Sequence, residues 1–525
     1  MSVENASPSA EIVDPLHGGH QSLATNALGL PQVLFCIVTG CAPIAAMLFN
    51  DPWAVYGGGW AAPSAFILAT VAFFVFSIGY VQMAKRVTAA GGFYSFVSHG
   101  FGQVLGMGTA VLIAGCYIFF AAGVAGVTAY FTNATLQDWV GWGPPVWLVE
   151  VVTLAIMASL AYLHIELTAK VLGFFLVIEL TALLVFSFAA LFQSKSGLHL
   201  SSLEPWKLFD GKANGSQAVF GAGTLGVGFF GAFWSWIGFE MAPNYAEESR
   251  EPKRIMGPAT YISVIGLGVL YTFVTWMLVV AWGASHVADG VNQQFSGKIA
   301  SVFYPQTDRV FGLDLGSASL LTRAFQLTIV TGSFACQLAF FNTSTRYLFS
   351  MGREGVLPKQ LGRTHRVHRS PHIAAAVVAA LIGLIMAGFL LKDHSTLGAL
   401  LKLGTWAPMM GNLGILAIMA LVSLAIIRYF IMAPSEQVVG GRIFSVVIAP
   451  VLAAGAMVFT TYLLIKNRTT LGGGKGVIFV DYMWVWPLLL FALGVVIALV
   501  YRSRDPARYQ GIGRYLHEDA PERAA

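Results

Sequence analysis

The chain has 525 residues, of which 56% are hydrophobic and 10% are charged, and its formal net charge is +5 at pH 7. Soluble domains carry about 25% charged residues, so this composition predicts a polytopic protein of the lipid bilayer. The positive excess follows from membrane topology, and we expect no nucleic-acid partner.

The N-terminal residues 1–27 are polar and contain no Lys or Arg, so they lack the basic region of a cleaved signal peptide. We expect a disordered cytoplasmic tail there. The four cysteines all fall in apolar stretches and show no CxxC spacing, so neither a disulfide framework nor a zinc site is predicted. We interpret them as packing residues.

Apolar stretches of about 20 residues are long enough to cross a bilayer. Twelve such spans are predicted, near residues 29–49, 60–84, 103–131, 146–164, 168–192, 217–241, 258–282, 318–349, 372–391, 398–430, 443–465 and 482–501. The sequence therefore predicts an all-α membrane protein. Lys and Arg gather on the cytoplasmic side of membranes, and 19 of the 30 fall on one side if the N-terminus lies inside. We expect both termini in the cytoplasm.

Two of these spans are interrupted. The first contains Thr39-Gly40-Cys41-Ala42-Pro43 near its middle, where Pro43 removes an amide donor and clashes with the preceding turn. The sixth contains Trp234-Ser235-Trp236-Ile237-Gly238. Taken alone, each break is explained equally well as a simple helix kink or as part of a binding site. Breaks at matching places in two halves point to a transporter binding site, because the freed backbone groups hold a charged substrate.

Three sequence motifs carry a resemblance to a known family. The stretch FWSWIGFEMAPNYAEESREPKRIMGPAT at the sixth span resembles the sixth-helix signature of the amino acid–polyamine–organocation superfamily. RVTAAGGFYSFVSHGFG, from Arg86 to Gly102, and NTSTRYLFSMGREGVLPKQLGRTH, from Asn342 to His365, are similar to its loops after the second and eighth helices.

The resemblance implies the LeuT-type fold, in which two inverted five-helix repeats precede two terminal helices. The repeats would occupy residues 28–192 and 217–430, the terminal helices 442–502, and a cytoplasmic tail 503–525. Many amino acid carriers of this superfamily have a Gly-Ser-Gly type break in the first helix, whereas some members with a proline there resemble polyamine importers. The resemblance leaves both substrate classes open.

The resemblance also implies a place for the substrate head group. The amides around Thr39, Gly40, Cys41 and Ala42 would bind a carboxylate, and the carbonyls of Phe233, Trp234, Ser235, Trp236 and Ile237 would bind an ammonium. Trp234 and Trp236 are candidates for the wall of the site, where an indole face covers an amine. Either indole is alternatively a packing residue.

Glu240 follows the second break by a few residues, and similar transporters use this acid in a gate. A carboxylate there is either hydrogen-bonded across helices or exposed in a vestibule. We expect it in the outer part of the pathway and outside the head-group pocket.

Glu179 lies eleven residues into the fifth span, about 16 Å along a helix and near the middle of a roughly 30 Å hydrocarbon core. The resemblance places it where many family members hold a lysine that occupies the sodium position of the fold. We predict that Glu179 is the coupling residue and carries a proton. The alternatives are that it binds sodium, pairs with a cationic substrate, or is a permanently protonated structural acid.

The chain contains neither HExxH nor GxSxG, so hydrolase chemistry has no visible metal or nucleophile. We therefore predict a secondary active transporter and not an enzyme. It would import an amino acid or related amine across the plasma (inner) membrane, without a cofactor or metal, using a proton or sodium as coupling ion. The alternatives are an amino acid or polyamine exchanger, a sodium-coupled symporter, a non-transporting sensor and a membrane-embedded enzyme. The oligomeric state stays open.

Overall fold

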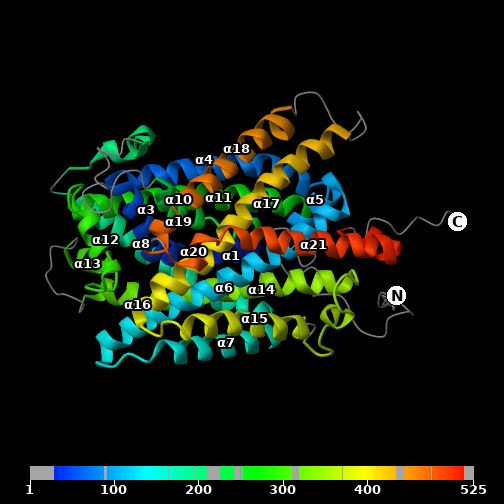
Figure 1. Cartoon of the computed structure of the whole chain (residues 1–525). Coiled ribbons are helices and arrows are strands. Elements are labelled where there is room, and N and C mark those ends of the chain that lie inside the picture. The colour runs from blue at the N-terminus through cyan, green and yellow to red at the C-terminus, as the bar shows by residue number, and fades with distance from the viewer. Residues whose placement is uncertain are drawn as a thin grey trace, which may run out of the picture.

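The computed structural model describes residues 29–87, 91–163, 165–194, 197–209, 225–241, 249, 252–309, 319–368, 370–432, 443–474 and 476–513. The regular elements within these ranges are helices (Figure 1), so the prediction of an all-α polytopic membrane protein is confirmed. The tail predicted over residues 1–27 lies outside the described residues.

The first half of the chain contains nine helical elements that concern us here. They are α1 (Leu30–Cys41), α2 (Pro43–Ala45), a π-helical segment (Ala46–Asn50), α3 (Asp51–Gly58), α4 (Ala62–Ala84), α5 (Phe93–Phe101), α6 (Gln103–Val140), α7 (Val146–Leu163) and α8 (Ile165–Phe192).

In the second half of the chain, the first helix of the following set is α10. The elements are α10 (Leu225–Trp234), α11 (Pro252–Trp282), α12 (Val287–Phe295), α13 (Tyr304–Arg309), α14 (Leu320–Arg353), α15 (His372–Leu390), α16 (Thr396–Gly398), α17 (Gly404–Met432), α18 (Ala449–Lys466), α19 (Arg468–Leu471), α20 (Ile478–Asp481), α21 (Val485–Arg504) and α22 (Pro506–Gly511).

Within the described residues, ten helical stretches are long and apolar enough to cross a membrane. One of them, Leu30–Ala84, has 55 residues and contains two of the predicted spans. The span predicted at 217–241 is described only from residue 225 onward, and its helix α10 is too short for that count. The total of twelve crossings and the division into two repeats stay predictions.

The bundle is organised around α6. This helix contacts α5, α7, α14, α15, α17 and α21, and 83% of its most apolar window is buried. The corresponding buried share is 28% for α7 and α15 and 17% for α21. A helix that is apolar all round is stable only in a protein interior or in lipid. The fold therefore places α6 inside and the outer faces of α7, α15 and α21 toward lipid.

The C-terminal segment Pro506–Gly513 packs against the end of the bundle that carries α5. Ile512 is fully buried, and the Gly513 N–H donates to Glu354 Oε1 at 3.1 Å. Tyr94 of α5 donates its hydroxyl to the same oxygen at 2.8 Å. Burial raises the pKa of Glu354 from its ordinary value of 4.5 to about 7, against the opposing effects of these two hydrogen bonds and the Arg353 charge. Glu354 thus joins three segments that are distant in sequence.

Candidate functional site

The first helix breaks between α1 and α2. Ala42 has left-handed backbone angles, φ 43° and ψ 75°, and its N–H donates back to the carbonyls of Val38 and Thr39 at 2.9 and 3.1 Å. Pro43 then begins α2, as proline does at a first helical position because it has no N–H to donate. The sequence prediction of a break over Thr39–Pro43 is therefore confirmed.

The second break follows α10. Ile237 donates its N–H to the Trp234 carbonyl at 3.0 Å, a tight turn that replaces the α-helical spacing, and Gly238 has φ +123°. An added Cβ on Gly238 would lie 2.7 Å from the carbonyl carbon of Gly40. Only glycine fits this conformation and this close approach of two backbones. The break predicted over Trp234–Gly238 is also present.

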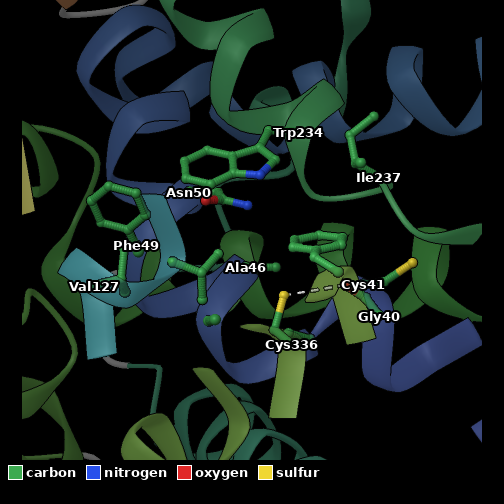
Figure 2. Close-up of a pocket in the computed structure, with 13 residues that line it drawn as sticks. Gly40, Cys41, Ala46, Phe49, Asn50, Val127, Trp234, Ile237 and Cys336 are labelled. Carbon is green, nitrogen blue, oxygen red and sulfur yellow. Dashed lines mark hydrogen bonds between the residues drawn. The ribbon is translucent and has the colours of Figure 1, made fainter. Parts of the chain in front are cut away.

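The two breaks lie against each other, and side chains connect them. Cys41 Sγ donates to the Trp236 carbonyl at 3.4 Å, and Asn50 Nδ2 donates to Ser235 Oγ at 3.2 Å. A third segment joins from α14, whose Cys336 Sγ donates to the Gly40 carbonyl at 3.3 Å (Figure 2). The backbone groups at the breaks are thereby held in place by contacts between three helices.

A cavity of about 320 Å³, including its mouth, opens between these helices. Residues of both breaks line this space, together with residues of α6 and α14. Figure 2 shows the Trp234 indole above it, Cys336 below it and Phe49 to one side. The lining residues are Gly40, Cys41, Ala42, Ala45, Ala46, Phe49, Asn50, Val124, Val127, Trp234, Ile237, Cys336 and Phe340.

Five of the nine predicted substrate-site residues line this cavity: Gly40, Cys41, Ala42, Trp234 and Ile237. The other four, Thr39, Phe233, Ser235 and Trp236, are buried beside it and are not among its lining.

The side chains of Phe233 and Trp236 both pack on Phe73 of α4, at ring distances of 5.2 and 5.8 Å. Trp236 also contacts Tyr271 of α11 at 5.1 Å. Its indole is therefore part of the packing between helices, whereas Trp234 meets Phe49 edge-on at 5.3 Å beside the cavity. Of the two wall candidates, Trp234 is the one placed at the cavity.

The sequence did not predict the cavity-lining residues of α6, of α14 and of the π-helical segment Ala46–Asn50. Val124, Val127 and Phe340 lie in long apolar helices, where no pattern distinguishes the inward face. Asn50 carried a usable signal, because an amide next to a membrane-length apolar run has to find a partner. Its partner is Ser235 of the other break.

Glu240 lies outside the cavity lining and is fully engaged. Tyr117 of α6 donates its hydroxyl to Oε1, and the Gly238 N–H donates to Oε2 at 2.9 Å. Tyr80, near the end of α4, donates to the Glu240 carbonyl at 2.8 Å. The carboxylate thus fastens the second break to α6.

The outer position in the pathway that we expect for Glu240 stays a prediction. Tyr80 packs on Phe93 and Phe96 of α5 at 5.5 and 5.6 Å, so Glu240 lies on the α5 side of the cavity. If the N-terminus lies inside, as the charge pattern predicts, the second span ends in the cytoplasm and the α5 side of the cavity would be the cytoplasmic one.

Glu179 lies in α8 beside the first break, and its side chain is 3% exposed. An added Cβ on Gly332 of α14 would be 2.3 Å from Glu179 Oε2 and 2.4 Å from Ile44 of α2. Gly332 therefore leaves the space that lets the carboxyl and the broken helix meet. Within the described part of the chain, Oε2 has no hydrogen-bond partner.

Among the residues that the structure describes, no group of three or more His, Cys, Asp or Glu side chains is arranged to hold a metal ion. Glu179 and Glu240, the carboxyls described beside the two breaks, have separate surroundings: Glu179 faces Gly332, and Glu240 is bound by Tyr117 and Gly238. Such an arrangement is suited to holding a helix position or a proton.

Comparison with known proteins agrees with this geometry. The chain is 22% identical to the branched-chain amino acid permease BcaP of Bacillus subtilis, over 84% of this chain and 85% of that protein. It is 21% identical to the low-affinity putrescine importer PlaP of Escherichia coli K12, over 66% and 72%. It is 22% identical to the mouse Asc-type amino acid transporter 1, over 58% and 53%.

These relatives are transporters, so the chain is a transport protein and not an enzyme. The profile of the family described as amino acid permease matches residues 28–486, which is most of the 525 residues. By this match the chain belongs to the amino acid permease family.

Proposed function

We propose that this protein is a secondary active transporter that imports an amino acid or a related amine across the plasma membrane, driven by a proton. The observation that carries the proposal is the cavity at the junction of the two breaks. Sites of this kind bind substrate at the interface of two halves, and rocking of one half against the other alternates access.

The head group of the substrate would lie between the breaks. A continuous helical segment begins at Pro43 and runs to Gly58, and the start of a helix favours a carboxylate. On the opposite side, the Trp234 indole covers the cavity and can attract an ammonium by cation–π contact worth about 0.5–2 kcal/mol. These two features together suit a zwitterionic end.

Glu179 is the group that we propose as the coupling residue. It contacts the broken first helix and α14, so a change in its charge acts directly on an element that would move. A buried carboxylate oxygen without a donor is costly, and a proton on Oε2 removes that cost. Proton binding and release would therefore favour different positions of the first helix.

Glu240 is proposed as part of a gate on the α5 side of the cavity. Its two oxygens hold α6 and the second break together, so this contact has to change if the two helices separate during transport. The carboxylate fastens the closed arrangement and is not part of the substrate pocket.

The test is uptake by purified protein in proteoliposomes. Labelled leucine, alanine and putrescine would be supplied under an imposed pH gradient, a sodium gradient, or no gradient with unlabelled substrate inside. We expect one or more of these solutes to accumulate when the outside is acidic. Accumulation under a sodium gradient alone would identify sodium as the coupling ion. Uptake that occurs only with unlabelled substrate inside would identify an exchanger. Specific binding without flux in any arm would overturn the proposal in favour of a sensor.

A further inference from the structure

The cavity at the breaks is apolar beyond the backbone. Its side chains come from Ala, Val, Phe, Ile, Trp and Cys, and the lining residues that the structure describes include no Asp, Glu, Lys, Arg or His. Asn50 supplies an amide, and its nitrogen is already bound to Ser235. The polar groups for a ligand are therefore concentrated at the two breaks.

A second cationic group on the substrate would have no carboxylate within this lining. Glu240 is engaged by Tyr117 and Gly238, and Glu179 faces Gly332 and Ile44. Moving an ammonium from water into an apolar site without a counter-charge costs far more than one cation–π contact returns. A diamine or a basic amino acid would leave one charge unpaired here.

Besides the breaks, α6 and α14 contribute apolar side chains to the cavity wall. Val124 and Val127 come from α6 and Phe340 from α14, and Val127 lies below Phe49 in Figure 2. Val127 is 1% exposed, and its Cγ2 would be 3.2 Å from a Cβ on Gly404. The start of α17 therefore packs closely behind this part of the wall. Such a wall can bind a small branched or unbranched hydrocarbon side chain by excluding water.

We infer that this cavity selects neutral amino acids with a compact apolar side chain and rejects polyamines and basic amino acids. The inference rests on the proposed function and narrows its substrate class. It assigns Val124, Val127 and Phe340 as the residues that determine selectivity. The breaks bind the charged head group of the substrate, and these three side chains contact the substrate's side chain.

Two thiols in the cavity allow occupancy to be measured without transport. Cys41 and Cys336 line the cavity, whereas Cys36 and Cys116 do not and serve as internal controls. The wild-type protein would be treated with a small thiol reagent, and modification at each cysteine would be followed by mass spectrometry. Leucine or alanine is expected to slow modification of Cys41 and Cys336 at least about fivefold, and putrescine is not.

The outcomes separate this inference from the proposed function. If putrescine or lysine protects these thiols as well as leucine does, the cavity binds substrate but the selectivity is wrong. If none of the solutes protects them, substrate does not bind at the breaks, and both the inference and the proposed site fall.

A pair of variants tests the selectivity directly. Val127→Asp introduces a carboxylate into the apolar wall, and Val127→Asn is its uncharged match in size. We expect Val127→Asp to raise putrescine uptake about tenfold or more over Val127→Asn, while leucine uptake falls in both. Equal putrescine uptake by the two variants would contradict the inference. The thiol measurement on the wild-type chain does not depend on how well either variant folds.

Discussion

Trp234 is the residue at which the proposed site can be tested by a single truncation. Its indole lines the cavity and meets Phe49 edge-on at 5.3 Å. Trp234→Ala removes the cation–π contact, so we expect the KM for substrate to rise about 2- to 30-fold. Trp234→Phe keeps an aromatic face and should retain most of the affinity. Uptake kinetics measure both, and a wild-type KM in Trp234→Ala would remove Trp234 from the site.

Glu179 tests the coupling mechanism at the same scale. Glu179→Gln resembles the protonated carboxyl, so we expect substrate binding and exchange to persist while accumulation driven by a pH gradient is lost. Glu150 is a matched control, because it is also a fully buried acid and lies in α7, away from the breaks. Counterflow and gradient-driven uptake would be compared in both variants. A Glu179→Gln protein that still concentrates substrate with wild-type pH dependence would make Glu179 structural.

At the scale of elements, the contact between the two broken helices depends on Gly238. Its φ of +123° and the 2.7 Å approach to Gly40 leave no place for a Cβ. Gly238→Ala is expected to destabilise the protein by about 1–3 kcal/mol and to abolish uptake, because the added methyl group forces the two breaks apart. Thermal unfolding in detergent measures the first effect. Gly455→Ala in α18, where a Cβ meets nothing within 4 Å, should leave both properties near wild type.

The docking of the C-terminal segment Pro506–Gly513 is expected to depend on pH through Glu354. The pKa of this carboxyl is about 7 when the segment is docked and near 4.5 for an exposed glutamate, so the docked form binds the proton. Docking should therefore be strongest below pH 4.5 and weaken as the pH rises through 7, by about tenfold between pH 6 and pH 8. Hydrogen exchange of residues 505–513 measures this change.

The geometry agrees with a proton on Glu354. Oε1 accepts the bonds from Tyr94 and Gly513, and Oε2 has no partner in the described part of the chain, so a proton on Oε2 leaves both bonds intact. Arg353 is the charged group that acts on this carboxyl, and in the docked segment Arg508 is paired with Asp505.

Glu354→Gln is the control for that response. It should stay docked at both pH values, and it separates the effect of Glu354 from any effect of His99 on α5. Equal exchange of residues 505–513 in the wild-type protein at pH 6 and pH 8 would refute the prediction.

For the whole molecule, the sequence predicted the class, the breaks and the family, because composition, Pro43 and three long motifs are visible without coordinates. The inward faces of α6 and α14 were not predictable. Their residues are uniformly apolar, so only packing decides that Val127 faces a cavity while another valine faces lipid. Likewise, residues 506–513 read as part of a polar tail, but Ile512 and Gly513 at its end are buried, and Gly513 binds Glu354, which is more than 150 positions away.

Between the cavity and the C-terminal segment runs a column of tyrosines. Tyr117 binds Glu240 and stacks on Tyr347 at 5.9 Å, and Tyr347 lies 6.2 Å from Tyr94, which binds Glu354. Two buried carboxyls, Glu240 and Glu354, therefore lie at the two ends of this row of three tyrosines. A fluorescent probe on α22 would be a remote sensor of the transport cycle. The emission of this probe should change when substrate opens the Tyr117–Glu240 contact, and Tyr347→Ala should abolish that change.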